Sequence, residues 1–346
     1  MSLDTDTATL LADQLDRLFA QRVDAKLLRK VEAGEPAAAL EDEVEALGLT
    51  LALVPEEAGG AGLAWSEISG VLEALGRHAA PLPLSERMAA AWAMAAAGME
   101  VPEDAPLATW DRLALAGGKV SGACVIPFGK PGARVLGTAG EGADAQLVLL
   151  EIPEGRALPT IGRDPRLVVE FAAATPLASA PAPMDGEALP AALAVMRAGQ
   201  ISGALNHVLA ESIDYGNTRV QFGRPIGKFQ AIQHLVAEQA GESAAAKAAV
   251  QLALRAMDAA PSWQAAAVAK IRASLAVAKV SAVAHAVHGA IGVTEEHMLH
   301  HATRRLWQWR DEAGDENAWS ERLGRAAVAG GGGELWKTVV ALSGGR

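Results

Sequence analysis

The spacing of apolar residues divides the chain into helical and β-prone stretches. Close to the start, Leu10, Leu11, Leu15, Leu18 and Phe19 recur at intervals that place them on one face of a helix. Further helices are expected over 41–47, 66–77 and 85–99, separated by a Pro- and Gly-rich turn at 54–62 and by prolines at 81 and 83. The first 104 residues are therefore predicted to form a helical domain.

The pattern changes between residues 105 and 185, where glycine and proline are frequent and the apolar runs are short. Strands are expected at 112–116, 120–127, 133–136, 146–152 and 167–171. Short runs with turn residues between them favour a small antiparallel sandwich or barrel over βαβ units.

A helical pattern returns near residue 186 and continues to residue 346. Long helices are expected at 187–219, 227–258, 262–289 and 315–328, with a last short helix after the glycines at 330–333. Long helices with short connections are typical of an antiparallel four-helix bundle. The expected fold is therefore mainly α, with a small β domain between two helical domains.

Composition supports this picture and excludes several classes of function. The chain has 76 alanines among its 346 residues, which favours helices that approach closely. Its net charge of −11 argues against binding to nucleic acid or to an anionic membrane. The single cysteine, Cys124, excludes an intrachain disulfide framework and a cysteine-based zinc cluster, and it fits a reducing cytoplasm.

The expected location is cytoplasmic, without a membrane span. The longest apolar run, around residues 88–99, is too short to cross a bilayer. The acidic N-terminus lacks the basic region of a secretory signal.

One string carries most of the chemical information. Residues 218–234 read TRVQFGRPIGKFQAIQH, and the glycines and proline in it close one helix and begin another. Arg219 and Gln221 offer hydrogen-bond donors at this corner, beside the aromatic ring of Phe222. Donors next to an aromatic plane suit a ligand with phosphates and a ring. The alternative is a tight helical hairpin anchored by Phe222.

The string resembles a motif of the acyl-CoA dehydrogenase family, and two further stretches are similar to motifs of that family. Residues 45–63, together with 72–77, look like its N-terminal signature, and residues 287–297, VHGAIGVTEEH, look like its late glycine motif. The resemblance covers nearly the whole chain. It implies an N-terminal helical domain (1–104), a middle β domain (105–185) and a C-terminal four-helix bundle (186–346).

The resemblance also implies a cofactor and partners. In the family, the Arg, Gln and Phe of the first motif reach the ADP half of an FAD held by a neighbouring subunit, and here they match Arg219, Gln221 and Phe222. The glycine motif lies against the same FAD, and this chain keeps Gly289 and Gly292. A homodimer or tetramer, or a heteromer with a related subunit, is implied, with electron-transfer flavoprotein as the electron acceptor.

The implied reaction is the FAD-dependent oxidation of an acyl-CoA thioester to the trans-2-enoyl-CoA. In the family, a carboxylate removes the α proton and the β hydride passes to flavin N5. Burial in a dry pocket raises the pKa of such a carboxylate. A gapless count from the glycine motif places the base at Ala313, so Glu312, one residue earlier, or Asp311 is the predicted base. The alternative is that these acids cap a helix or face solvent.

Two departures from the family pattern keep other functions open. Residues 106–112 stand where the family has its Thr-Glu-Pro-x-Ala-Gly-Ser-Asp flavin loop, and Ala290 replaces a glycine of the late motif. One alternative is a catalytically incomplete subunit that completes a partner's FAD site in a heteromer. Another is a binding protein that retains only the fold.

Histidines gather between residues 285 and 301, but no metal site is expected there. His285 and His288 can share one helix face, and His297, His300 and His301 follow. No acidic residue accompanies the first pair at an interval typical of metal ligands.

Overall fold

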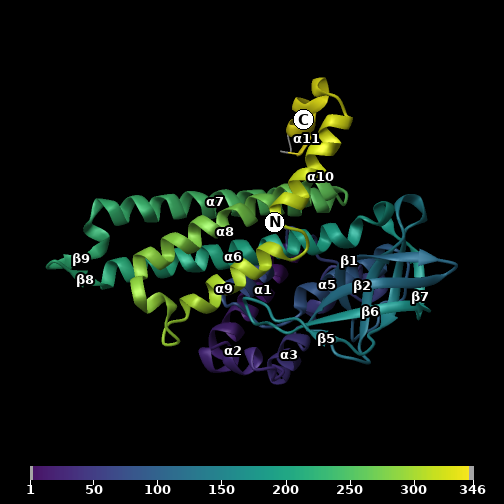
Figure 1. The fold of residues 1–346 in the computed structure, drawn as a ribbon, viewed down its shortest axis with the longest axis horizontal. Helices are drawn as coiled ribbons and strands as arrows, with labels where there is room; N and C mark the ends of the chain where they lie inside the picture. The colour runs from purple at the N-terminus through teal and green to yellow at the C-terminus, as the bar shows by residue number, and fades with distance from the viewer. Residues whose placement is uncertain (1–2, 343–346) are drawn as a thin grey trace.

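The computed structural model describes residues 3–342. Helices from the N-terminal and C-terminal parts of the chain lie beside a β sheet (Figure 1). The first helices are α1 (Leu3–Arg22), α2 (Ala25–Glu32), α3 (Ala38–Glu45), α4 (Ser69–Arg77) and α5 (Leu84–Ala96). Helix α2 was not expected. It begins at the N-cap Asp24, whose carboxylate accepts the N–H of Leu27 at 2.7 Å.

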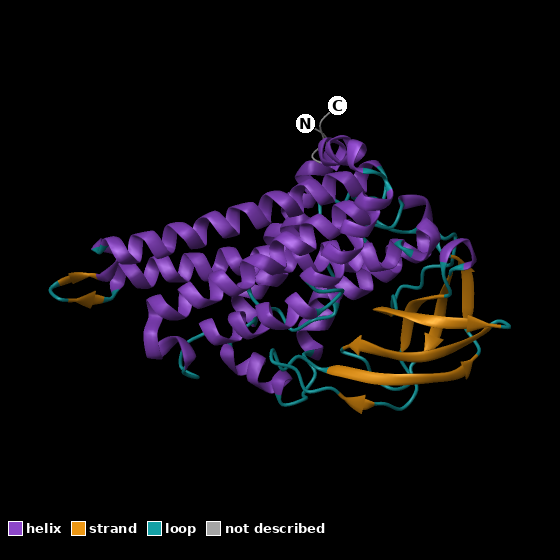
Figure 2. Ribbon diagram, turned by 45° about the horizontal axis from the view of Figure 1, so that its top comes forward, coloured by secondary structure: helices purple, strands orange, loops and turns teal. Residues whose placement is uncertain are grey.

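The β domain is a seven-stranded sheet in the order β5-β6-β2-β1-β3-β4-β7. Its strands are β1 (Leu107–Ala116), β2 (Lys119–Pro127), β3 (Arg134–Ala139), β4 (Gln146–Glu151), β5 (Arg156–Ala157), β6 (Arg166–Ala174) and β7 (Ala178–Pro181). All five expected strands overlap strands of this sheet, and the short strands β5 and β7 were missed. Figure 2 shows the sheet packed beside the helices as a separate layer.

One strand pairing differs from the antiparallel expectation. Strand β1 pairs antiparallel with β2 but parallel with β3, and its register shifts between Ala108 and Arg112. The chain reverses twice between β1 and β3, once after β1 and once in the loop after Pro127, so β3 runs in the direction of β1. With this irregularity, β1 pairs with β3 on one side through both of its halves and with β2 on the other side near its end.

The C-terminal part contains three long helices, α6 (Ala188–Thr218), α7 (Gln230–Ala259) and α8 (Trp263–His288). Helix α9 (Leu299–Asp311) packs against α6 and α8, and α10 (Glu316–Ala329) packs against α8. Figure 1 shows α10 and α11 (Leu335–Leu342) leaving the body of the molecule. Helix α9 was missed because its sequence, LHHATRRLWQWRD, is mostly polar. The expected fold class, helical domains around a small β domain, is confirmed.

Two helices of the structure are long and apolar enough to cross a membrane, although no membrane span was expected from the sequence. Helix α6 and the stretch Trp263–Val293 satisfy the length and composition of a membrane-crossing helix. In α6, however, 94% of the most apolar 18-residue stretch is buried within the molecule, as in the central helix of a bundle.

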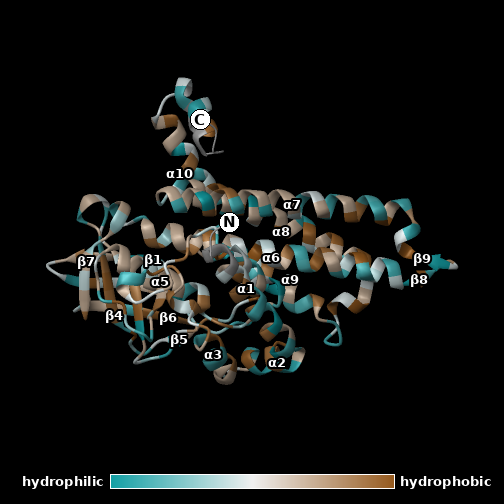
Figure 3. Ribbon diagram, turned by 180° about the vertical axis from the view of Figure 1, so that it is seen from behind, coloured by the Kyte–Doolittle hydropathy of each residue, from teal (hydrophilic) through white to brown (hydrophobic). Residues whose placement is uncertain are grey.

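The far end of the bundle is polar. Figure 3 shows hydrophilic residues there, around β8 and β9.

Small residues bring α4 and α6 into backbone contact. A Cβ atom added at Gly76 would lie 1.9 Å from the carbonyl oxygen of Gln200, and one added at Gly203 would lie 2.2 Å from that of Glu73. No side chain fits at these distances, so the N-terminal domain rests directly on the backbone of α6.

We expect Gly203→Ala to lower the free energy of unfolding by about 2 kcal/mol or more, because the two helices must move apart. The matched control is Gly241→Ala on α7, where an added Cβ meets nothing within 4 Å. That variant should gain up to about 1 kcal/mol from helix propensity. Urea unfolding of both variants tests this; equal stability would contradict the close approach.

Candidate active site and cofactor-binding hairpin

The two candidate bases follow each other in sequence but occupy different environments. Helix α9 ends at Asp311, which is exposed to solvent. Glu312 then leaves the helix with an extended backbone (φ −81°, ψ 149°), and its side chain turns into the interior. The next residues, Ala313 and Gly314, both have positive φ, so the chain reverses immediately after Glu312.

The carboxylate of Glu312 is held by three side chains. Its Oε1 accepts hydrogen bonds from Nε and Nη2 of Arg166, at 2.8 Å and 2.5 Å, and from Nε2 of Gln308 at 2.9 Å. Its Oε2 lies 3.0 Å from Nη2 of Arg197. Arg166 begins β6, whereas Arg197 comes from α6. The residue therefore joins the sheet to the bundle.

The network continues into the N-terminal domain. Arg197 forms an ion pair with Glu86 of α5 and a hydrogen bond with Gln200, and its guanidinium lies 5.9 Å from the ring centroid of Trp309. Glu86 and Arg197 are both buried. Arg166 and Arg197 thus neutralise Glu86 and Glu312 in the interior. Charged groups can be buried when each is paired in this way.

These partners set the proton affinity of Glu312. Burial by itself raises the pKa of a carboxylate, but Arg166 and Arg197 outweigh this effect and hold the pKa of Glu312 below its ordinary value. The direction is opposite to the raised pKa that a dry pocket gives to a general base. For Asp311, burial raises the pKa, although the residue lies at the surface.

The loop after Glu312 is clamped from two sides. The buried ammonium of Lys270 on α8 donates to the carbonyl oxygens of Arg310 at 2.7 Å and Gly314 at 2.8 Å. The indole N–H of Trp319 donates to the carbonyl of Ala313 at 2.8 Å. Burial lowers the pKa of Lys270 to about 7. The loop is therefore fixed by hydrogen bonds to its backbone, independently of the Glu312 side chain.

Ala313, the position where the gapless count places the family's base, lines a cleft of about 390 Å³. The cleft is also lined by Trp110, Arg112, Glu187, Gly314, Trp319 and Arg322. Its carboxylate, Glu187, is paired with Arg112 at 3.0 Å and with Arg322 at 2.6 Å. At this position, therefore, the lining of the cleft contains an alanine and no carboxylate.

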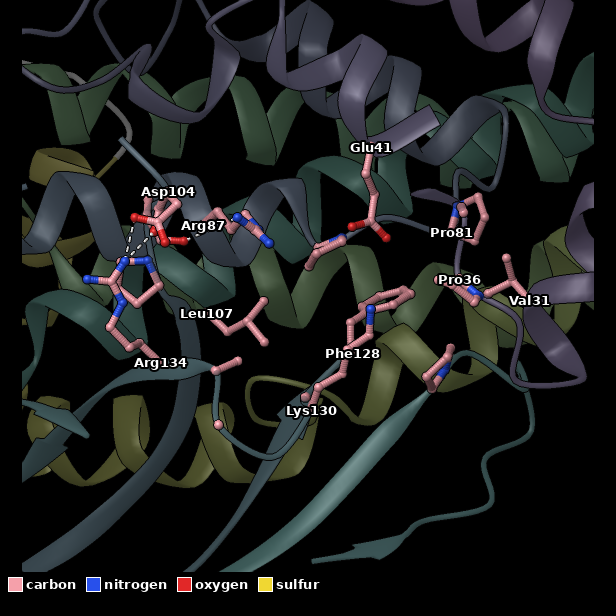
Figure 4. Close-up of a pocket in the computed structure, with 18 of the residues that line it drawn as sticks. Val31, Pro36, Glu41, Pro81, Arg87, Asp104, Leu107, Phe128, Lys130 and Arg134 are labelled. Carbon is pink, nitrogen blue, oxygen red and sulfur yellow. Dashed lines mark hydrogen bonds and ion pairs between the residues drawn. The ribbon is translucent and has the colours of Figure 1, made fainter. Parts of the chain in front are cut away.

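A second cavity, of about 410 Å³, lies between the N-terminal helices and the sheet (Figure 4). Its lining includes Pro81, Arg87, Leu107, Phe128, Lys130 and the ion pair of Arg134 with Asp104. Asp311 and Glu312 do not belong to that lining. Phe128 does, and the guanidinium of Arg166 lies 5.3 Å from its ring centroid. The cavity therefore adjoins the Glu312 network through Phe128 and Arg166.

The predicted FAD-binding residues lie on a hairpin at the other end of the bundle. Strands β8 (Val220–Gln221) and β9 (Arg224–Pro225) are joined by Phe222 and Gly223, both with positive φ. Positive φ at both central positions is typical of a tight hairpin turn. Arg219, Gln221 and Phe222 are exposed, and the Phe222 side chain is 90% exposed. Figures 1 and 2 show this hairpin projecting beyond the helices.

The glycine motif packs beside the end of α6. Helix α8 ends at Gly289, which has a φ of 64°, and Gly292 is buried so tightly that a Cβ atom there would lie 3.0 Å from Leu299. The ring of Tyr215, four residues before Arg219, stacks on His288 with centroids 4.6 Å apart. The structure therefore places both FAD-related motifs around the last turns of α6.

The two halves of an FAD site differ in how well this chain matches them. The exposed donors and ring of the hairpin fit an ADP group held by another molecule. Residues 107–112 form part of strand β1, so the chain has no loop there to enclose a flavin ring. Sequence reasoning missed Arg166, Glu86 and Lys270, because no local pattern marks which charged side chains become buried.

Comparisons with known proteins agree with this architecture. Residues 5–105 match the N-terminal domain of acyl-CoA dehydrogenases, and residues 190–326 match the C-terminal domain. Acyl-CoA dehydrogenase IpdE2 of Mycolicibacterium smegmatis is 31% identical over 73% of this chain and 76% of its own length. The chain belongs to the acyl-CoA dehydrogenase family, whose members are FAD-dependent oxidoreductases.

Two solved structures are similar over nearly their full length. A variant of the Tcur3481-Tcur3483 steroid ACAD is 28% identical, with a TM-score of 0.84 over 94% of this chain and 98% of its own. The ChsE4-ChsE5 complex of Mycobacterium tuberculosis has the same TM-score of 0.84, at 22% identity, over 95% of this chain and 98% of its own. The second likeness bears on the fold alone.

We expect Arg166→Ala to lower the free energy of unfolding by about 3–5 kcal/mol, because it leaves part of a buried charge without a partner. Arg325→Ala, in the exposed pair with Glu321, is the matched control and should change stability by less than about 0.5 kcal/mol. The cost should persist at neutral pH and decrease as the pH falls through the lowered pKa of Glu312. Urea unfolding at pH 7 and at a pH well below 4 measures this; equal losses in the two variants at pH 7 would contradict it.

Lys270 should make stability depend on pH. Its pKa is about 7 in the folded chain and ordinarily 10.5, so the unfolded chain binds more protons between these values and stability rises with pH there. Lys270→Met should weaken the rise between pH 7 and pH 9, while lowering stability by leaving two carbonyl groups unpaired. Unfolding midpoints at the two pH values test this; an unchanged slope would exclude Lys270 as its cause.

Proposed function

We propose that this chain is a catalytically incomplete subunit of a heteromeric acyl-CoA dehydrogenase, and that it completes the partner's FAD site with Arg219, Gln221 and Phe222. The observation that carries the proposal is that neither residue 312 nor residue 313 offers a free carboxylate. Glu312 is buried and paired with two arginines, and Ala313 occupies the position that faces the cleft.

The chemistry of proton abstraction supports this assignment. A general base must reach the α carbon of the substrate with an unshared oxygen lone pair. The carboxylate of Glu312 accepts from Arg166 and Gln308 and pairs with Arg197, so releasing it would break buried interactions worth several kcal/mol. The side chain of Ala313 has no proton acceptor.

The exposed hairpin supports the other half of the proposal. An aromatic side chain that is 90% exposed at a turn contributes nothing to the core of its own chain. Arg219 and Gln221 are exposed beside Phe222 and can therefore contact a ligand on a second molecule. Such a role requires no flavin loop in this chain's own β domain.

The similar structures fit the same proposal. The ChsE4-ChsE5 structure is a complex, and the name Tcur3481-Tcur3483 likewise joins two names. We infer that this chain likewise pairs with a related subunit that supplies the flavin loop and the catalytic base. Acyl-CoA is then the substrate of the assembled enzyme, with electron-transfer flavoprotein as its electron acceptor.

A second candidate function is an active dehydrogenase in which Glu312 is the base. The observation in its favour is the contact of Arg166 with Phe128, which places the Glu312 network next to a cavity of about 410 Å³. In this case, substrate binding must move Arg166 away from Glu312.

Absorbance spectra of the chain purified alone and purified with its co-expressed partner subunit distinguish the two candidates. We expect the chain alone to be colourless and the complex to show a flavin spectrum. Arg219→Ala and Phe222→Ala should reduce the FAD content of the complex several-fold without preventing association. Arg255→Ala, which removes an exposed arginine from α7, is the matched control and should retain full FAD content.

A different outcome would support the second candidate. If the chain alone is yellow, if an acyl-CoA thioester bleaches it, and if Glu312→Gln abolishes the bleaching, the chain is itself a dehydrogenase. Full FAD content in the hairpin variants of the complex would overturn the proposed role of Arg219 and Phe222.

A further inference from the structure

Three potential metal ligands meet where α6, the end of α8 and the following loop come together. Glu211 lies on α6, His288 is the last residue of α8, and His297 follows the glycine motif. Their ligand atoms, one from each side chain, all lie within 4.8 Å of one another. This cluster is separate from the Glu312 network and has no part in the proposed function.

His288 has the hydrogen bonding of a metal-binding imidazole. Its Nδ1 lies 2.8 Å from the carbonyl oxygen of Ala284 and can only donate to it, so the proton resides on Nδ1. Nε2 is then a bare lone pair, and it is buried without a hydrogen-bond partner. Only 4% of His288 is exposed, and Tyr215 covers one face of its ring. An unpaired buried acceptor is costly unless something binds it.

Glu211 and His297 complete the cluster from two other directions. Nε2 of His297 lies 4.0 Å from Oε2 of Glu211, and the two histidine rings meet edge to face with centroids 5.0 Å apart. His297 Nδ1 accepts the N–H of Leu299 at 3.1 Å. Coordination through Nε2 would move the ring proton to Nδ1, which could then no longer accept from Leu299, so that hydrogen bond would be lost. Glu211 supplies the single negative charge that two neutral imidazoles need beside a divalent cation.

We propose that Glu211, His288 and His297 bind a divalent metal ion of intermediate softness, such as Zn²⁺. Two imidazoles and one carboxylate are a common ligand set for zinc and leave a fourth position for water. Tetrahedral coordination at about 2.1 Å requires the ligand atoms to approach to about 3.4 Å, so the three side chains must rotate toward one another when the metal binds. A hydrogen bond that fixes the imidazole tautomer, as Ala284 does for His288, is typical of such ligands.

The bound metal would act as a staple for the cofactor-related segments. Glu211 lies eight residues before Arg219, about 12 Å along α6. His288 and His297 flank the glycine motif. A metal at this point therefore ties the motif to the helix that carries the hairpin.

The test titrates Zn²⁺ or Co²⁺ into the untagged, full-length protein after treatment with a chelator. We expect one ion per chain, the visible absorption of tetrahedral Co²⁺, and a rise in Tm with metal concentration. Glu211→Gln and His297→Ala should each weaken binding by at least about tenfold. Both residues are only partly buried, so these variants carry the test even if His288→Ala fails to fold.

A matched control guards against binding elsewhere. His234→Ala removes an exposed histidine on α7 and should bind the metal like the parent protein. Absence of binding, equal binding in Glu211→Gln, or loss of binding in His234→Ala would each overturn the proposal. None of these readouts involves FAD, so they are independent of the proposed function.

Discussion

The buried ion network around Glu312 is the interaction on which the rest of the structure depends. It joins α5 of the N-terminal domain, α6 of the bundle, the start of β6 and the end of α9 through Glu86, Arg197, Arg166 and Glu312. Buried charges are stable only when every partner is present. The three parts of the chain must therefore assemble together before any of these side chains can leave water.

The same network determines how the chain relates to its family's chemistry. A carboxylate that two arginines stabilise is a weak base, and its lowered pKa follows from those partners. In the adjoining loop, Lys270 and Trp319 hold the backbone while Ala313 faces the cleft. The loop is therefore held in place through its backbone and through the Glu312 side chain. The exposed Phe222 hairpin, in contrast, is fully available to another molecule.

Prediction from sequence succeeded where a local pattern carries the information. Apolar spacing located α6, α7, α8 and α10, and glycine and proline marked the turns of the β domain. The glycines and proline of the motif at 218–234 indicated the turn between α6 and α7, but the two short strands β8 and β9 within it were not predicted. Helix α9 was missed because its buried face includes the polar residues His301, Arg305 and Gln308. The parallel pairing of β1 with β3 was missed because strand order depends on contacts between distant residues.

The sequence alone thus determined most of the helical and β segments, the family motifs and the residues at positions 311–313, because each depends on neighbours along the chain. Only the tertiary structure decided what those residues do. Asp311 and Glu312 are adjacent in sequence, yet Asp311 faces solvent and Glu312 is buried between two arginines. Glu211 likewise meets His288 and His297 only because α6 and α8 pack side by side. Charge pairing and ligand geometry arise between distant segments, and no local pattern encodes them.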